Sequence, residues 1–157
     1  MSVPNHQASG RVLDPFHLAI GVHDLAAARS FYGELLGCTE GRHATRWVDF
    51  DLFGHQLTCH LRDGLAPSGG SGDEGANDVD GDRVPIPHFG VVLSMDHWRV
   101  LADRLADAGV DFLLPPRVRF RGRAGEQATF LLRDPSCNAV EFKAMADPRQ
   151  LYGVDEP

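Results

Sequence analysis

Long apolar runs are missing from the 157 residues, since no stretch approaches the roughly 18 residues that a membrane-spanning helix needs. Residues 1–14 also lack the apolar core of a secretory signal, so we expect a cytoplasmic protein that does not insert into membranes. Basic residues are in deficit, with 15 Lys and Arg against 22 Asp and Glu and a net charge of −7. A nucleic-acid binder needs a basic face. We therefore expect a small-molecule partner and no nucleic acid.

Cysteine is scarce as well. Cys38, Cys59 and Cys137 are odd in number and widely spaced, with no CxxC pair, which excludes a disulfide framework and a zinc knuckle. We interpret them as free thiols that behave like small apolar side chains, with Cys59 and Cys137 as minor candidates for a nucleophile. The content of 43% hydrophobic and 24% charged residues is that of an ordinary globular domain.

The sequence does contain a repeat. Residues 15–22 and 86–93 are both short apolar runs with a histidine near the start, typical of strands. Helical patterns follow at 25–36, after the capping residue Asp24, and from about Asp96 to Gly109. Strand patterns come next, at 45–52 and 56–61 in the first half and at 112–114, 127–133 and 139–143 in the second. This order predicts an α+β fold made of two related modules.

Residues 64–83 join the two halves and are rich in glycine and aspartate. We expect a flexible linker there, with a solvated acidic turn at 77–82. The predicted organisation is one structural domain, made of an N-terminal tail (1–14), a first module (15–63), the linker (64–83), a second module (84–146) and a C-terminal tail (147–157).

Three polar residues stand out in the apolar strands: His17, His88 and Glu141. Because side chains alternate along a strand, the bulky apolar residues from Phe16 onward face the helices, and these three polar residues face the opposite side. A carboxylate in an apolar strand is costly without a partner. Two repeat-equivalent histidines and a glutamate on corresponding faces therefore predict a metal site.

These segments resemble the vicinal oxygen chelate superfamily, which includes glyoxalase I, bleomycin-resistance proteins and extradiol dioxygenases. The resemblance covers about residues 16–144. It is carried by four segments, FHLAI (16–20), ARSFYGELLG (28–37), PHFG (87–90) and DPSCNAVEF (134–142), the last with Cys137 where the family has glycine.

The resemblance implies two βαβββ modules that form a cupped, barrel-like mixed sheet with the helices outside. It also implies that His17, His88 and Glu141 bind one divalent metal ion, as in extradiol dioxygenases. Such a two-His-one-Glu set suits Fe(II) first, with Mn, Zn or Ni as substitutes. A homodimer is the expected assembly.

Thr58 occupies the place of the further carboxylate ligand that glyoxalase I-like members use, which favours an open site. His60, two residues along the same face, is the candidate catalytic acid or base. The weaker candidates for substrate contact are Thr58, Arg119, Gln127 and Thr129, where Arg119 belongs to an alternating set with Arg117 and Arg121.

The predicted function is that of a metal-dependent oxidoreductase, an extradiol-type dioxygenase that binds vicinal oxygens of its substrate. Two alternatives stay open. One is an isomerase, epimerase or glyoxalase-like lyase on the same metal, and the other is a metal-free protein that sequesters a ligand, as resistance proteins do.

Overall fold

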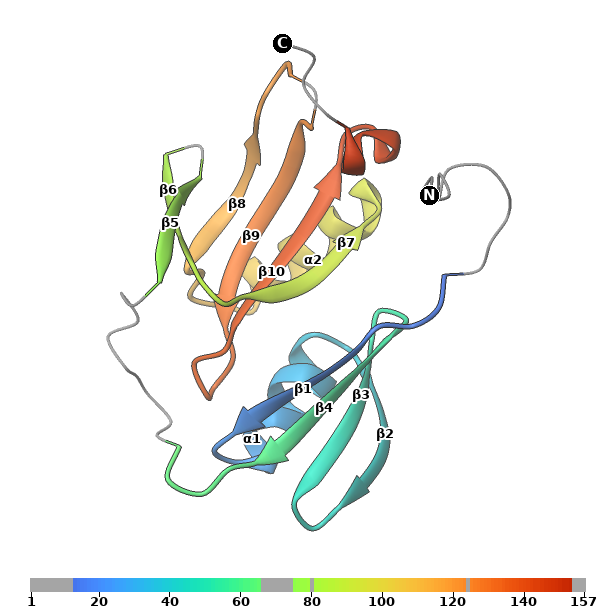
Figure 1. Cartoon of the computed structure of the whole chain (residues 1–157), viewed down its shortest axis with the longest axis vertical. Helices are drawn as coiled ribbons and strands as arrows, with labels where there is room; N and C mark the ends of the chain where they lie inside the picture. Colours follow the sequence, from blue (N-terminus) through green and yellow to red (C-terminus); the bar gives the residue numbers. More distant parts are fainter. Residues whose placement is uncertain (1–12, 66–74, 80, 124, 154–157) are drawn as a thin grey trace, which may run out of the picture.

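The computed structural model describes residues 13–65, 75–79, 81–123 and 125–153 (Figure 1). The first module begins with β1 (His17–Val22) and α1 (Leu25–Ala28), which continues as a π-helical stretch, η1 (Arg29–Leu35). Three strands follow, namely β2 (Thr39–Ala44), β3 (Trp47–Leu52) and β4 (His55–Leu61). The predicted cap is confirmed, because the Asp24 carboxylate accepts from the backbone N–H groups of Ala26 and Ala27.

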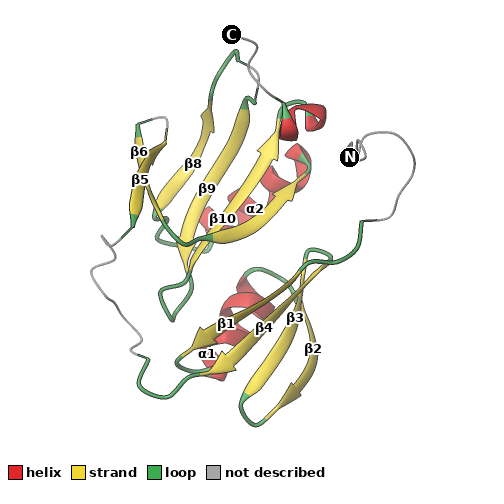
Figure 2. Ribbon diagram, viewed as in Figure 1, coloured by secondary structure: helices red, strands yellow, loops and turns green. Residues whose placement is uncertain are grey.

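The second module has the same order of elements. It consists of β7 (Phe89–Leu93), α2 (Met95–Asp107), β8 (Leu114–Arg119), β9 (Gln127–Arg133) and β10 (Ala139–Met145), and a short helix, η2 (Pro148–Tyr152), follows it. In Figure 2, α1 lies behind β1 and β4, and α2 lies behind β7 and β10, so each helix covers one face of its own sheet. The α+β fold of two βαβββ modules is therefore confirmed.

Strand register shows how close the repeat is. The sheets have the orders β1-β4-β3-β2 and β7-β10-β9-β8, and in each the first strand is parallel to the last. Ala19 lies opposite Thr58 in the first module, and Gly90 lies opposite Glu141 in the second. Thr58 is thus the structural equivalent of Glu141, in agreement with the place that the family resemblance gave it.

One apolar core serves both modules. The Phe53 ring lies 5.5 Å from that of Phe142, centroid to centroid. The hydroxyl of Tyr32 in η1 donates to the carboxylate of Asp134 at 2.9 Å, and the amide of Asn138 donates to the Gly21 carbonyl at 3.0 Å. The turn before β10 therefore joins the second module to the first.

The structure differs from the expected linker. Residues 76–79 and 82–85 form a hairpin, β5 (Ala76–Val79) and β6 (Asp82–Pro85), beside β8 in Figure 1. Asp82 is not solvated as the acidic turn was expected to be, because it pairs with Arg117 at 2.6 Å. The residues from 66 to 74 lie outside the described part. The hairpin was missed because its strands have only four residues each and little apolar alternation.

Three smaller expectations also need correction. β2 was not predicted, and its six residues are all exposed, so it lacks the apolar pattern of a buried strand. Phe16 is 63% exposed, since it precedes β1 instead of packing under the helix. The two sheets do not close into a barrel, because no described strand of one pairs with a described strand of the other. Among the described residues, no helix is long and apolar enough to cross a membrane.

Candidate metal and substrate site

His88 and Glu141 lie together on the open face of the second sheet. The Nε2 atom of His88 is 3.0 Å from Oε2 of Glu141, and the glutamate side chain is only 3% exposed. Each of the two side chains is oriented by a further hydrogen bond. Nδ1 of His88 is 2.7 Å from the Pro85 carbonyl, and the Thr129 hydroxyl donates to Oε1 of Glu141 at 2.6 Å. A carbonyl on Nδ1 fixes the ring so that Nε2 points at the carboxylate.

The two groups stabilise each other's charged form. The hydrogen bond to Glu141 raises the pKa of His88 above its usual value, against the opposing effect of burial. Burial alone raises the pKa of Glu141, but the hydrogen bonds from His88 and Thr129 and the nearby Lys143 outweigh it and lower that pKa. The hydrogen bond between them therefore favours the protonated form of His88 and the ionised form of Glu141.

His17 lies in the other module, also on the open face of its sheet. Its Nδ1 is 2.8 Å from Oε1 of Gln56, and the Gln56 amide donates to Asp49 at 3.1 Å. Thr58 donates to the same Asp49 carboxylate at 2.6 Å. The predicted substrate residue Thr58 is therefore bound to a buried aspartate on the next strand.

The structure does not bring His17 to the other two predicted ligands. Among the described residues there is no group of three His, Cys, Asp or Glu side chains placed to hold a metal ion. The expected convergence of three strands within one chain is thus not seen, because the sheets stay separate. Metal binding by His17, His88 and Glu141 stays a prediction.

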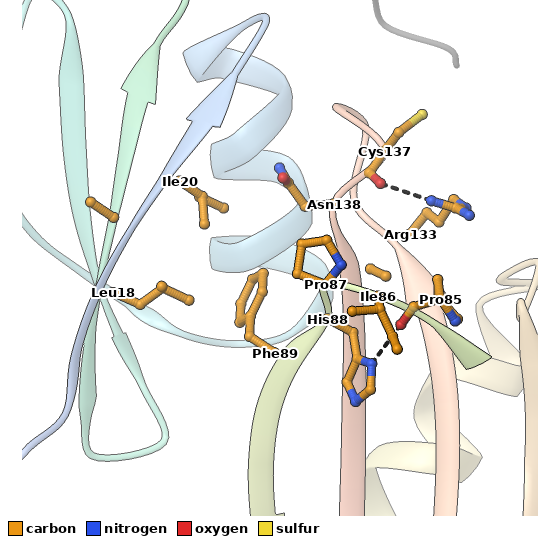
Figure 3. A pocket seen from close by; sticks show the side chains of 12 residues that line it. Leu18, Ile20, Pro85, Ile86, Pro87, His88, Phe89, Arg133, Cys137 and Asn138 are labelled. Carbon is orange, nitrogen blue, oxygen red and sulfur yellow. Dashed lines mark hydrogen bonds between the residues drawn. The ribbon is translucent and has the colours of Figure 1, made fainter. Parts of the chain in front are cut away.

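His88 borders two cavities. The larger, of about 430 Å³, lies at the seam between β1 and β7 and has an apolar wall that includes Leu18, Ile20 and Phe89 (Figure 3). In Figure 3, Leu18 and Ile20 project from β1 toward Phe89, and Asn138 approaches from the turn before β10. The smaller cavity, of about 240 Å³, is lined by Glu141 and Lys143 as well as His88. Together they leave room for a small ligand beside the His88–Glu141 pair.

The remaining sequence candidates divide between the two sheets. Thr129 touches Glu141, while Gln127 and Arg119 lie opposite each other two residues further along. Arg117 and Arg119 project from β8, but Arg121 follows the end of that strand, so the predicted row of three arginines is a row of two. His60 is exposed on β4 opposite Gly21, and it lines neither of the two cavities.

The cysteines behave as the apolar interpretation predicted. Burial raises the pKa of Cys38 to about 12, and burial also raises the pKa of Cys59. A thiol must ionise to act as a nucleophile, so neither is activated. Cys137 has φ of 67°, in the region that favours glycine, and its repeat equivalent Gly54 has φ of 93°. The departure from the family glycine therefore leaves the backbone conformation unchanged.

Four residues that contribute polar groups were not singled out from the sequence as part of the site, namely Asp49, Asp82, Lys143 and, through its carbonyl, Pro85. Lys143 carried a signal, because it lies two residues from Glu141 and so on the same face, and its Nζ is 3.6 Å from Oε2 of Glu141. Asp49 alternates with apolar Val48 and Phe50 in the same way. Asp82 and the Pro85 carbonyl come from the hairpin segment and gave no comparable pattern.

Solved structures with this fold are numerous. A glyoxalase/bleomycin resistance protein/dioxygenase from Alicyclobacillus acidocaldarius is 35% identical, with a TM-score of 0.72 over 88% of this chain and 96% of its own. A glyoxalase/dioxygenase from Nostoc punctiforme is 19% identical, with a TM-score of 0.61 over 93% and 100%. The fosfomycin resistance protein FosX from Listeria monocytogenes is 16% identical, with a TM-score of 0.58 over 89% and 98%. The last two show a shared fold.

No curated protein matches the sequence. A family model does, and it covers residues 15–142, from the start of the first module to the strand that carries Glu141. The predicted resemblance is confirmed at the level of the superfamily, and the extradiol subgroup is not distinguished by it. The chain belongs to the glyoxalase/bleomycin resistance protein/dioxygenase superfamily.

Proposed function

We propose that this protein is a metal-dependent enzyme of the extradiol-dioxygenase type, acting on a small molecule with two neighbouring oxygens. The observation that carries the proposal is the 3.0 Å approach of His88 Nε2 to Glu141 Oε2. An imidazole nitrogen and a carboxylate oxygen are donor types that divalent ions take from proteins. Held this close together, they would be able to bind one divalent ion.

The groups behind the pair support this reading. The Pro85 carbonyl next to Nδ1 leaves Nε2 as the ligand atom, and Thr129 orients the carboxylate. Metal-binding histidines and carboxylates are usually held in this way. When bound, the ion would act as a Lewis acid and a template for the two substrate oxygens.

We assign the third ligand to His17 of a second copy of the chain. His17 is exposed on the open face of its sheet, and β1 is an edge strand, so the residue is accessible to another subunit. Its Nδ1 contact with Gln56 leaves Nε2 for a metal. The expected homodimer would then build each site from His17 of one subunit and His88 and Glu141 of the other.

Other side chains of this chain have simpler tasks in the proposal. The cavity of about 430 Å³ is bordered by the apolar side chains of Leu18, Ile20 and Phe89, which exclude water from the ring of a small substrate. His60, on the same face as His17 and Thr58, moves a substrate proton when the second copy closes the site. Two histidines and one glutamate would suit Fe(II), and Mn, Zn and Ni fit the same donors.

A metal-free protein that sequesters its ligand is the second candidate. The observation that favours it is Lys143, whose Nζ lies 3.6 Å from Glu141 and supplies positive charge where the metal would bind. An isomerase or glyoxalase-like lyase gains less support, since Thr58 stands where a fourth ligand, a carboxylate, would be needed.

Metal content of the purified protein tests the proposal. Elemental analysis after reconstitution with Fe(II) is expected to give about one ion per chain, and His17→Ala, His88→Ala and Glu141→Ala should each lose most of it. His97→Ala is the matched control, because His97 is exposed on α2. Unchanged metal content in all three variants would overturn the site and favour the sequestering protein.

Mixing variants tests the shared site. His17→Ala and Glu141→Ala chains, refolded together, form heterodimers with one intact site, so metal content should recover to about a quarter of the wild-type value on random pairing. No recovery would place His17 in the same chain as its partners. Oxygen uptake with a panel of catechols then separates the oxygenase from an enzyme that turns over without oxygen.

A further inference from the structure

Two arginines, of which one is buried, and one aspartate form a charged cluster away from the His88–Glu141 pair. Arg119 of β8 is 2% exposed, and Asp82 of the β5–β6 hairpin is 11% exposed. One oxygen of Asp82 is 2.6 Å from NH1 of Arg117, and the other is 3.1 Å from NH2 of Arg119. With two positive charges against one negative charge, the cluster keeps a net charge of about +1.

Arg119 is poorly satisfied in this arrangement. Its Nε and NH2 atoms and Oδ2 of Asp82 are buried without a hydrogen-bond partner among the described residues, so the 3.1 Å contact lacks hydrogen-bond alignment. A buried guanidinium with free donors is costly. Its planar fork is suited to donate to both oxygens of a carboxylate at once. The hairpin positions Asp82 so that its carboxylate satisfies only part of the hydrogen-bonding capacity of Arg119.

The cluster faces the same side of the sheet as the proposed metal site. Arg117 lies opposite Thr129 in the β8–β9 register, and Thr129 lies opposite Lys143 in the β9–β10 register. Thr129 also donates to Glu141 at 2.6 Å. Two strand spacings separate β8 from β10, which is about 10 Å. A small molecule can span that distance with one end at each position.

We propose that Arg117 and Arg119 form a subsite for a substrate carboxylate, which Asp82 occupies until the substrate displaces it. This inference deepens the proposed function and rests on it for the position of the substrate's reacting oxygens. The Asp82 carboxylate occupies the position proposed for the substrate carboxylate. It shows that a carboxylate fits between the two guanidinium groups. The substrate class is therefore small carboxylic acids with two vicinal oxygens at the other end.

Calorimetric titration of the metal-free protein with benzoate tests the subsite without the metal. Benzamide is the uncharged control ligand. We expect weak binding of benzoate and none of benzamide to the wild type. Asp82→Asn should tighten benzoate binding about tenfold, because the competing carboxylate is gone. Arg117→Gln should weaken it at least tenfold, and this 40% exposed side chain is less risky to replace than buried Arg119.

Arg99→Gln is the matched control, since Arg99 is exposed on α2 and its loss should leave benzoate affinity unchanged. The inference is overturned if Asp82→Asn binds benzoate no more than twofold tighter than the wild type, or if Arg117→Gln binds it equally well. Metal content separates the two proposals, because neither variant removes a proposed ligand. Loss of the subsite with normal metal content would refute this inference alone, and benzoate binding as expected in a protein that takes up no metal would refute the proposed function alone.

Discussion

The imidazole of His88 stands between two acceptors, the Pro85 carbonyl at 2.7 Å and the Glu141 carboxylate at 3.0 Å. Without metal, the hydrogen bond between the ring and the buried carboxylate favours the charged form of each group. In the proposed metal-bound form, the ion would take the place of a proton on Nε2. Metal affinity should therefore rise with pH as His88 loses that proton.

The pair makes the stability of the metal-free protein depend on pH. The pKa of His88 is raised from 6.5, so its contribution is complete below about pH 6.5 and is lost as pH rises through the folded-state value. The pKa of Glu141 is lowered from 4.5, so its contribution is complete above about pH 4.5 and is lost as pH falls. Both contributions are present between these limits.

His88→Gln should thus destabilise the metal-free protein more at pH 5.5 than at pH 9. Urea unfolding in the presence of a chelator measures the free energy of unfolding at both values. His97→Gln, at an exposed position on α2, should lower stability equally little at either pH. An equal loss for His88→Gln at the two pH values would contradict the charged pair.

At the scale of elements, the β7–β10 pairing positions the candidate site. Gly90 lies opposite Glu141 in this parallel pair, and a Cβ atom at Gly90 would overlap the Glu141 carbonyl oxygen. Position 90 therefore requires glycine, because the backbone of the strand that carries Glu141 passes directly beside it.

Gly90→Ala should therefore cost about 3 kcal/mol or more of unfolding free energy, since a backbone contact cannot yield as a flexible side chain can. It should also reduce metal uptake, because Glu141 moves with its strand. Gly33→Ala in η1 is the control, where the nearest atoms to an added Cβ are 3.8 and 4.0 Å away. Thermal and urea unfolding compare the two variants, and equal stability for both would refute the proposed clash.

Elements with regular periodicity were predicted well. The strand at 127–133 has the predicted bounds. Helix α2 ends at Asp107, just before Gly109, where the sequence predicted that it would stop. Elements without periodicity were not predicted. The β5–β6 hairpin has only short polar strands, and the alternating arginines of β8 gave no sign that an aspartate from the linker would bury one of them. The Arg117–Asp82 contact of the same cluster joins residues 35 positions apart in the chain, beyond the reach of local sequence patterns.

At the scale of the whole molecule, Tyr32 and Asp134 join the modules. Burial raises the pKa of Tyr32 well above its usual value, and the neighbouring Asp134 raises it further, so the hydroxyl remains a donor. Asp134 also accepts from the backbone N–H groups of Ser136 and Asn138. The Asp134 carboxylate thus organises the turn before β10 and also accepts a hydrogen bond from the first module.

Tyr32→Phe should lower the free energy of unfolding by about 2 kcal/mol, because it leaves a buried carboxylate with one charged hydrogen bond fewer. Denaturant unfolding measures the loss. Tyr152→Phe is the control, since Tyr152 is 78% exposed. In the Asp134→Asn background the effect of Tyr32→Phe should shrink, and an undiminished effect would mean that the lost stability comes from packing around the ring instead.

The sequence by itself determined the two modules, their strand alternation and the superfamily, because helix caps, apolar periods and the DPSCN turn are local features that fix local structure. It also placed His88 and Glu141 on one face, which the structure confirms with a 3.0 Å contact. Only the tertiary structure decided that His17 stays apart from them and that Asp82 reaches Arg119. Both outcomes depend on how the two sheets and the hairpin pack together. The alternation of side chains along a strand predicts which face a residue lies on, but it does not predict how far apart the faces of two sheets are.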